Sequence, residues 1–309
     1  MKYTLLSNRV IFGALVLSSV IIFTSCKKDD ATPATPNTVV NVATTNGFTT
    51  LVSAIGTAGL TATLNGSGPF TVFAPTNAAF SAISVPSDPA ILGNILKYHV
   101  VSGKILSSAL PTSYATGVVT VNGDSVYVKK FPSGNAYVNG LKVDLANVDA
   151  SNGVVHVIGT VLLPPSASIV TAAQADTSFK LLVQSVIKCG LASALSGPGS
   201  LTVFAPTNTA FKAIGFDSTA IANANAATVN TLTNVLLYHV VPARAFSADL
   251  VEGLTTAPTL LTGKSLAFSV SGGAKVTGSG NAGTASNITK VNIVAKNGVI
   301  HVIDRVLLP

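Results

Sequence analysis

The chain has 309 residues, of which 48% are hydrophobic and only 9% are charged, whereas about 25% of residues are charged in ordinary globular domains. This composition excludes intrinsic disorder and, at roughly 150 residues per domain, predicts two domains. The formal net charge is +7, but the cations are scattered. No basic stripe is therefore available to neutralise a run of phosphates, and a nucleic-acid partner is not expected.

Residues 1–25 have the layout of a secretory signal peptide. Lys2 and Arg9 precede an apolar run over 10–23, which is shorter than the roughly 20 residues of a membrane-spanning helix. Thr24–Ser25 then precedes Cys26, and small residues before a cysteine resemble the lipobox of bacterial lipoproteins, in which that cysteine is lipidated. Several acyl chains make such an anchor stable. The alternative is an ordinary cleaved signal with an incidental cysteine.

Residues 26–36 are predicted to be the lipidated cysteine and a tether rich in Thr and Pro. The same kind of composition, without apolar periodicity, continues to Thr45. Directly after the cysteine, Lys27–Asp30 resembles the surface-export signal of some Gram-negative lipoproteins. We therefore expect an exported protein that is lipid-anchored to the outer membrane and exposed on the cell surface, with a periplasmic orientation as the alternative.

The first element predicted after the tether is a helix, because Leu51 and Ile55 follow a spacing near 3.6 residues. Phe70–Phe73 is a strand-like run. Pro75 is expected to stop this strand, because proline lacks the amide donor of a β-ladder. Thr76–Asn77 then supplies oxygens that can cap a short helix.

Further along, Asp88–Pro89 predicts another helix start, with an acid at the cap and proline in the first turn. Asn122–Gly123 and Asn139–Gly140 lie between Val- and Tyr-rich segments and predict hairpin turns. Helices and strands that occur in separate runs indicate the α+β class.

The whole pattern then occurs a second time, because four blocks of the first half recur in the same order in the second half. The pairs are Phe48–Val52 with Phe179–Val183, Thr71–Asn77 with Thr202–Asn208, Tyr98–Val101 with Tyr238–Val241, and Asn152–Ile158 with Asn297–Ile303. The spacing between matched blocks grows along the chain, which places insertions near 216–228 and within 271–286, where we expect surface loops. Two tandem domains are therefore predicted, over 37–164 and 165–309.

These blocks resemble the fasciclin domain family. The resemblance rests on the Phe-Ala-Pro-Thr-Asn block, the Tyr-His pair and the Asn-Gly-Val-x-His-Val-Ile block, which are present in both copies. It implies that each domain is a compact β-sandwich or wedge with helices packed against it. One departure is that Asp304–Arg305 of the second copy is replaced by Gly159–Thr160 in the first, so any polar contact of that acid is in question for domain 1.

All four histidines fall in the repeated blocks, as His99 and His156 in the first copy and His239 and His301 in the second. Such pairs could form a metal site or a proton relay. However, the alternation in Val154–Ile158 places His156 among core-facing apolar residues. No acid or cysteine recurs beside the histidines to complete a metal shell. We therefore predict four structural histidines, no metal, no cofactor and no catalytic residues.

The Tyr-His pairs have a second interpretation, which comes from the resemblance. In animal relatives of the fasciclin family this region has been associated with integrin-mediated cell adhesion, which would make Tyr98, His99, Tyr238 and His239 an adhesion motif. Their neighbours are aliphatic, and so apolar a run is seldom exposed. The sequence alone therefore favours burial of both pairs.

The function that these features favour is a non-catalytic, surface-displayed adhesion lipoprotein that binds glycans or proteins of cells, matrix or surface polysaccharide. The first alternative is a structural or scaffolding lipoprotein that binds other envelope proteins. The second is a metal protein or enzyme that uses the four histidines. The sequence does not identify the ligand, the binding face or the oligomeric state.

Overall fold

The structure is a computed structural model that describes residues 37–112, 115–165, 167–251 and 253–309. The predicted signal peptide (1–25) and the lipidated Cys26 with its tether (26–36) lie outside the described residues. No helix of the described part is long and apolar enough to cross a membrane.

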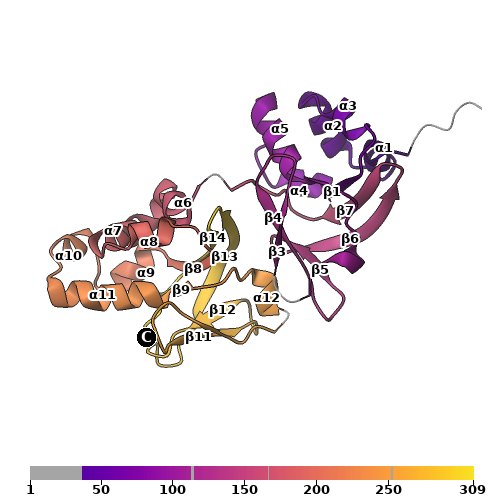
Figure 1. Cartoon of the computed structure of the whole chain (residues 1–309). Coiled ribbons are helices and arrows are strands. Elements are labelled where there is room, and N and C mark those ends of the chain that lie inside the picture. Colours follow the sequence, from indigo (N-terminus) through magenta and orange to yellow (C-terminus); the bar gives the residue numbers. More distant parts are fainter. Residues whose placement is uncertain (1–36, 113–114, 166, 252) are drawn as a thin grey trace, which may run out of the picture. The chain divides into compact units, whose positions relative to one another are not determined.

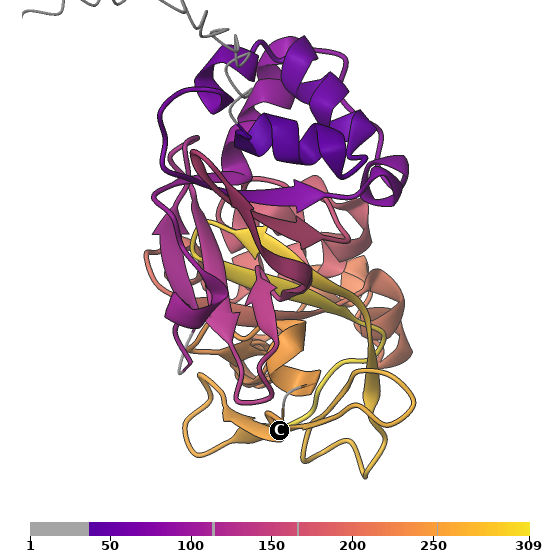
Figure 2. The same cartoon turned by 90° about the vertical axis from the view of Figure 1, so that its right-hand side faces the viewer.

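Domain 1 begins with a helical layer that packs on one face of a sheet. Its helices are α1 (Val39–Thr45), α2 (Thr49–Thr57), α3 (Thr61–Leu64), α4 (Asn77–Ser81) and α5 (Pro89–Tyr98). Figure 1 and Figure 2 both show α1–α3, in indigo, on one side of the strands of this domain. Leu51, Phe80 and Leu96 of this layer share a core with Val72 and Val155 of the sheet.

The sheet of domain 1 has seven strands in the order β2-β1-β7-β6-β5-β4-β3. The strands are β1 (Phe70–Pro75), β2 (Val100–Ser102), β3 (Thr116–Val119), β4 (Ser125–Lys130), β5 (Ala136–Val138), β6 (Leu141–Ala150) and β7 (Gly153–Ile158), with a short helix η1 (Ser107–Ala109). β1 is parallel to β7, whereas the other pairs are antiparallel. A bridge between Val101 and Thr120 joins the two ends of the sheet, so the sheet forms a nearly closed wedge.

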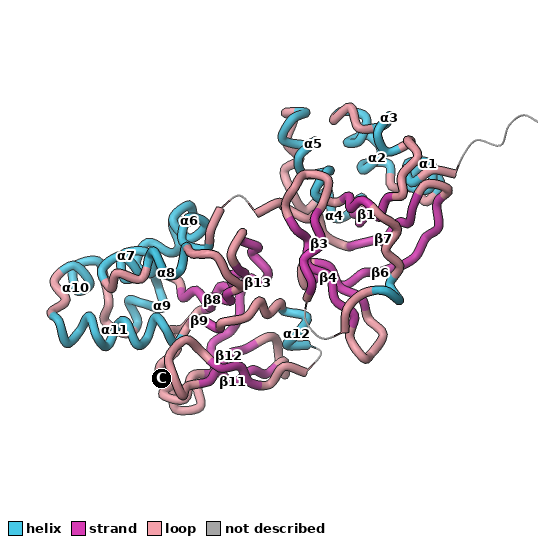
Figure 3. The backbone as a smooth tube through the Cα atoms, in the orientation of Figure 1, coloured by secondary structure: helices cyan, strands magenta, loops and turns pink. Residues whose placement is uncertain are grey.

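Domain 2 repeats this architecture with its own sheet, β10-β11-β12-β13-β14-β8-β9. Its helices are α6 (Ile169–Ala175), η2 (Thr177–Phe179), α7 (Lys180–Lys188), α8 (Ala192–Ser196), α9 (Asn208–Ala213), α10 (Ser218–Ala222), α11 (Ala226–Tyr238) and α12 (Ser247–Val251). Its strands are β8 (Leu201–Pro206), β9 (Val240–Val241), β10 (Thr256–Pro258), β11 (Ser265–Ser269), β12 (Lys275–Thr277), β13 (Ser286–Ala295) and β14 (Gly298–Ile303). In Figure 3 the helices α7–α11, in cyan, gather on one side of β8 and β13.

Local sequence signals explain several element boundaries. Thr76 Oγ1 accepts a hydrogen bond from the amide of Ala79 at the start of α4 (3.2 Å), and Asp88 Oδ1 accepts one from Ala90 at the start of α5 (2.8 Å). The Asn139–Gly140 turn has φ of 48° and 73°, as a type I′ hairpin turn requires. The helix starts and hairpins predicted at these positions are confirmed.

The strand β1 ends at Pro75, as predicted, but two other expectations from the sequence were wrong. The unstructured tether does not continue to Thr45, because α1 begins at Val39 and buries its valines against the helical layer. The insertion near 216–228 is not only loop, because α10 packs on α7 and buries Ile221.

Candidate functional site

His99 and His239 lie at the ends of two equivalent helices, and each ring bonds its helix to a distant segment of the same domain. His99 follows α5 and is 1% exposed. Its Nδ1 donates to the carbonyl of Ile95 (2.8 Å), and its Nε2 accepts from the amide of Leu162 (2.9 Å). His239 makes the matching pair of bonds after α11, to Val235 (2.7 Å) and from Leu307 (2.9 Å). Each ring therefore ties a helix end to the segment that follows the last strand of its domain.

Burial removes these two imidazoles from water and lowers the pKa of both His99 and His239 to about 4. The geometry assigns the tautomer, because the nitrogen that faces a carbonyl must carry the proton and the nitrogen that faces an amide must not. Both rings are therefore neutral at pH 7, with the proton on Nδ1.

His156 and His301 lie on the last strands, β7 and β14, and use the opposite tautomer. His156 Nε2 donates to the carbonyl of Ile105 (2.9 Å), and its Nδ1 accepts from the amide of Asn147 (3.2 Å). His301 bonds in the same way to Ala245 (2.9 Å) and Asn292 (3.4 Å). Burial lowers the pKa of His156, and lowers that of His301 to about 4.

A left-handed asparagine completes each of these networks. Asn147 and Asn292 have φ of 62° and 60° and lie at irregularities of β6 and β13. The amide side chain of Asn147 accepts from the backbone of Ser107 (2.9 Å) and donates to its hydroxyl (2.8 Å). Asn292 bonds to Ser247 in the same way. Sequence reasoning missed both asparagines, although each occupies the same position before the Asn-Gly-Val block of its copy.

The asparagine of each Asn-Gly-Val block also has a structural role that the sequence did not predict. Asn152 is 7% exposed. Its Oδ1 accepts from the amide of Val39 (2.9 Å), and its Nδ2 donates to the carbonyls of Leu64 (2.8 Å) and Gly66 (2.7 Å). Asn297 makes the equivalent three bonds, from Ile169 and to Leu195 and Gly197. One side chain thus joins the first helix, the third helix and the last hairpin of each domain.

Tyr98 and Tyr238 of the Tyr-His pairs are both 0% exposed. The hydroxyl of Tyr98 donates to the carbonyl of Ser125 (3.0 Å) and accepts from Asn139 (3.0 Å). Tyr238 bonds to Ser265 and to the amide of Ser279. Burial raises the pKa of Tyr98 to about 12. In this conformation none of the four side chains predicted as an adhesion motif reaches the surface, so a partner cannot touch them directly.

The acid that differs between the copies makes its contacts in domain 2. Asp304 accepts hydrogen bonds from the hydroxyl of Ser286 (2.9 Å) and from the backbone and side chain of Asn287 (2.8 and 2.6 Å). In domain 1, Gly159 takes this place, and a Cβ there would lie 3.2 Å from the carboxylate of Asp144. The first copy therefore places an acid on the neighbouring strand instead.

Within the described residues, no group of three or more His, Cys, Asp or Glu side chains is placed to hold a metal ion. The four predicted histidines lie in four separate backbone networks, two in each domain. Cys189, the one cysteine in the described residues, is a half-buried free thiol at the end of α7.

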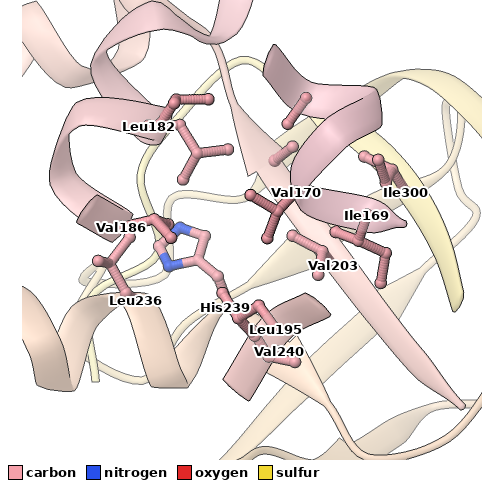
Figure 4. Close-up of a pocket in the computed structure, with 13 residues that line it drawn as sticks. Ile169, Val170, Leu182, Val186, Leu195, Val203, Leu236, His239, Val240 and Ile300 are labelled. Atoms are coloured by element: carbon pink, nitrogen blue, oxygen red, sulfur yellow. The ribbon is translucent and has the colours of Figure 1, made fainter. Parts of the chain in front are cut away.

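The helical layer of domain 2 encloses a small cavity of about 30 Å³ between α6, α7, α8, α11 and the sheet. Figure 4 shows Val186 and Leu236 beside the ring of His239 at its wall. A buried water needs two to four polar partners. The rest of the lining is aliphatic, and both nitrogens of His239 are already bonded. The cavity therefore has no group with which to recognise a polar ligand.

A cavity-filling substitution is available from the other copy. Ile55 of α2 occupies the place in domain 1 that Val186 of α7 occupies in domain 2. We expect Val186→Ile to stabilise domain 2 by about 0.5–1.5 kcal/mol, since the reverse change costs that much in packed cores. Urea unfolding measures the effect. Ile55→Val is the matched control and should destabilise domain 1; destabilisation by Val186→Ile would show that the cavity cannot accept a methyl group.

Comparison with known proteins identifies the repeated unit. The fasciclin domain family matches the chain twice, over residues 46–164 and 177–309. Transforming growth factor-beta-induced protein ig-h3 from Sus scrofa is 28% identical over 253 residues, which cover 80% of this chain and 35% of that protein. Protein sll1483 from Synechocystis is 43% identical over 137 residues, covering 41% of this chain and 74% of that protein. The chain thus spans about a third of the length of the mammalian relative.

A solved FAS1 domain pair from the insect cell adhesion molecule fasciclin I aligns over 86% of this chain and 98% of its own, with a TM-score of 0.43 and 21% identity. Each domain of the present chain is a nearly closed sheet wedge with helices on one face, which agrees with the predicted α+β class.

Proposed function

Because this chain belongs to the fasciclin family through both of its domains, we propose that it is a non-catalytic adhesion protein that binds glycans or proteins of cells, matrix or surface polysaccharide. We further propose that it is displayed on the outer membrane by lipidation of Cys26. The observation that carries the non-catalytic part is the bonding of the histidines. Every imidazole nitrogen has a backbone partner, so the rings are occupied in holding the fold.

The surface supports binding by neutral hydrogen bonds. The chain has few charged residues, 9% in all, so its exposed polar groups are mostly Ser, Thr and Asn. Hydroxyl and amide groups both donate and accept, which suits the hydroxyl groups of a glycan. Two domains on one tether can also engage a repetitive partner together, and such avidity raises an affinity by roughly 10²–10⁴-fold when the geometry permits.

Adhesion of whole cells to a glycan and matrix-protein array tests both parts of the proposal. Cells that carry the natural chain are expected to adhere to at least one class of spot. Cys26→Ser removes the proposed anchor and is expected to abolish adhesion, whereas Cys189→Ser, the matched control at the other cysteine, is expected to retain it.

Equal adhesion by cells that lack the chain would contradict the adhesive role, and unchanged adhesion of the Cys26→Ser cells would contradict the lipid anchor. Recovery of one stoichiometric envelope protein in a pull-down, without adhesion, would favour the scaffolding alternative. Stoichiometric zinc or iron that survives dialysis would favour the metal-protein alternative.

A further inference from the structure

One face of domain 1 and one segment of domain 2 are built as complementary surfaces. The domain 1 face, called the β4–β5 face below, presents Tyr127 and Lys129 of β4, Phe131 directly after β4, and Tyr137 of β5. The domain 2 segment, 244–249, leads into α12. Lys129 Nζ and Asp249 Oδ1 are 2.6 Å apart, and both side chains are only 14% exposed. Lys129 Nζ also lies 4.2 Å from the ring centroid of Phe131, so the cation is enclosed by an acid and an aromatic face.

Arg244 makes the second polar contact. Its Nη1 donates to the carbonyls of Ala295 and Gly298, at the turn between β13 and β14. These bonds fix the guanidinium plane from within domain 2. The Cζ atom then lies 4.0 Å from the ring centroid of Tyr127 in domain 1, a distance at which a cation is attracted to an aromatic face.

Apolar groups fill the space between these polar contacts. Phe246 lies 6.0 Å from Tyr127, measured between ring centroids. Ala248 is 4% exposed and forms a buried cluster with Phe131 and Tyr137. A Cβ atom on Gly140 would approach Phe246 Cβ to 2.6 Å, so only a glycine fits at this point of the contact.

The two copies differ at the positions that make this contact. Lys104, Leu106 and Ser108 of domain 1 stand where domain 2 has Arg244, Phe246 and Ala248. Leu106 is 40% exposed, whereas Phe246 is 2% exposed.

The residues of the β4–β5 face of domain 1 also differ from their counterparts in domain 2. Tyr127 and Lys129 of β4 are replaced by Ala267 and Ser269 of β11, both exposed, and Tyr137 of β5 by Lys275 of β12. The core positions between them remain apolar in both copies. Each copy therefore carries only the half of the contact that faces its partner.

We propose that the β4–β5 face of domain 1 is a docking surface for the 244–249 segment of domain 2 in the same chain, and that it holds the two domains as one fixed pair. The contact joins different surfaces of the two copies. A contact of this kind continues into a filament when every unit carries both surfaces. Here each domain carries only one of the two surfaces, so the assembly stops at two domains. The β11–β12 face of domain 2 is therefore not expected to bind a 244–249 segment of another chain.

Chemical labelling of lysines on the full chain tests this docking. In the natural protein, an amine-reactive reagent is expected to label Lys129 several-fold more slowly than Lys264, an exposed lysine between β10 and β11. Ala248→Arg places a long cation against Phe131 and is expected to raise the labelling rate of Lys129 several-fold. Val251→Arg, on the same helix at a residue that is 63% exposed, is the matched control and should leave the rate unchanged.

Tyr137→Lys is the second variant, because the other copy already has Lys275 at the equivalent position and the fold accepts it. It is expected to expose Lys129 as Ala248→Arg does. Far-UV circular dichroism shows that each variant remains folded. The proposal is overturned if Lys129 in the natural chain reacts as fast as Lys264, or if Lys129 of the folded Tyr137→Lys protein is labelled at the natural rate.

Discussion

Acidification from pH 6.5 to pH 4 is expected to destabilise both domains by several kcal/mol. In the folded state, burial lowers the pKa of His99, His239 and His301 to about 4, whereas the ordinary value is 6.5. The unfolded chain therefore binds more protons in this window, and stability falls as pH falls. Each of these rings contributes a loss of about 3 kcal/mol once the pH is below 4, against a typical total of about 5–15 kcal/mol.

Geometry supports the direction of this change independently. A protonated ring carries N–H groups on both nitrogens, so one of them would face the backbone amide of Leu162 in the His99 network. Carboxylates act in a lower range: hydrogen bonds from Ser178 lower the pKa of Asp176 from 3.8, so its contribution is lost only as pH falls further. The slope between pH 6.5 and 4.5 therefore reports the histidines.

Urea unfolding midpoints at pH 7, 6, 5 and 4, followed by circular dichroism, measure this loss. His301→Gln removes one titrating group while keeping an amide donor and acceptor, and is expected to reduce the slope of stability against pH. A stability that is constant across the window would contradict the buried, neutral state of the rings.

Asn152→Ala and Asn297→Ala are expected to be the most destabilising single substitutions at pH 7. Each removes three hydrogen bonds to backbone groups in the interior. A buried group left without a partner costs about 1–3 kcal/mol, so each change is expected to cost about 3–6 kcal/mol in its domain. Loss of this size approaches the total stability of a typical domain.

Urea unfolding of the full chain also tests this prediction. Asn297→Asp keeps the size and the acceptor but removes the donor to Leu195 and Gly197, so it separates lost hydrogen bonds from lost volume and is expected to destabilise as well. Asn223→Ala, at an exposed asparagine after α10, is the matched control and should change stability little. If Asn297→Ala behaved like Asn223→Ala, the internal role of this side chain would be disproved.

The sequence predicted correctly those helix starts and turns that are determined by the backbone preferences of neighbouring residues. Asp88–Pro89 and Asn139–Gly140 specify a helix start and a turn through their own backbone preferences. The helix α1 was missed because its cause is distant: the first amide of Val39 is satisfied by Asn152, far along the chain, and β-branched residues alone favour strands. The same reason applies to α10, which is stabilised by packing on α7.

For the histidines, the sequence predicted the burial of the ring but not its hydrogen-bond partners. Alternation in Val154–Ile158 predicted that His156 faces the core together with Val154 and Ile158, but every residue of β7 is buried, so both faces of this strand are covered. The partners of that ring, Ile105 and Asn147, come from other segments. Only the fold brings them together, and a left-handed asparagine in a strand has no distinctive sequence pattern.

Nitrogen-15 NMR of the four imidazole rings shows directly whether they are internal supports or accessible groups. At pH 7 we predict four neutral rings in fixed tautomers, with the proton on Nδ1 of His99 and His239 and on Nε2 of His156 and His301. None should titrate near pH 6.5. Rings that titrate at that pH, exchange between tautomers or shift on addition of zinc would show that the histidines are accessible groups and not internal supports.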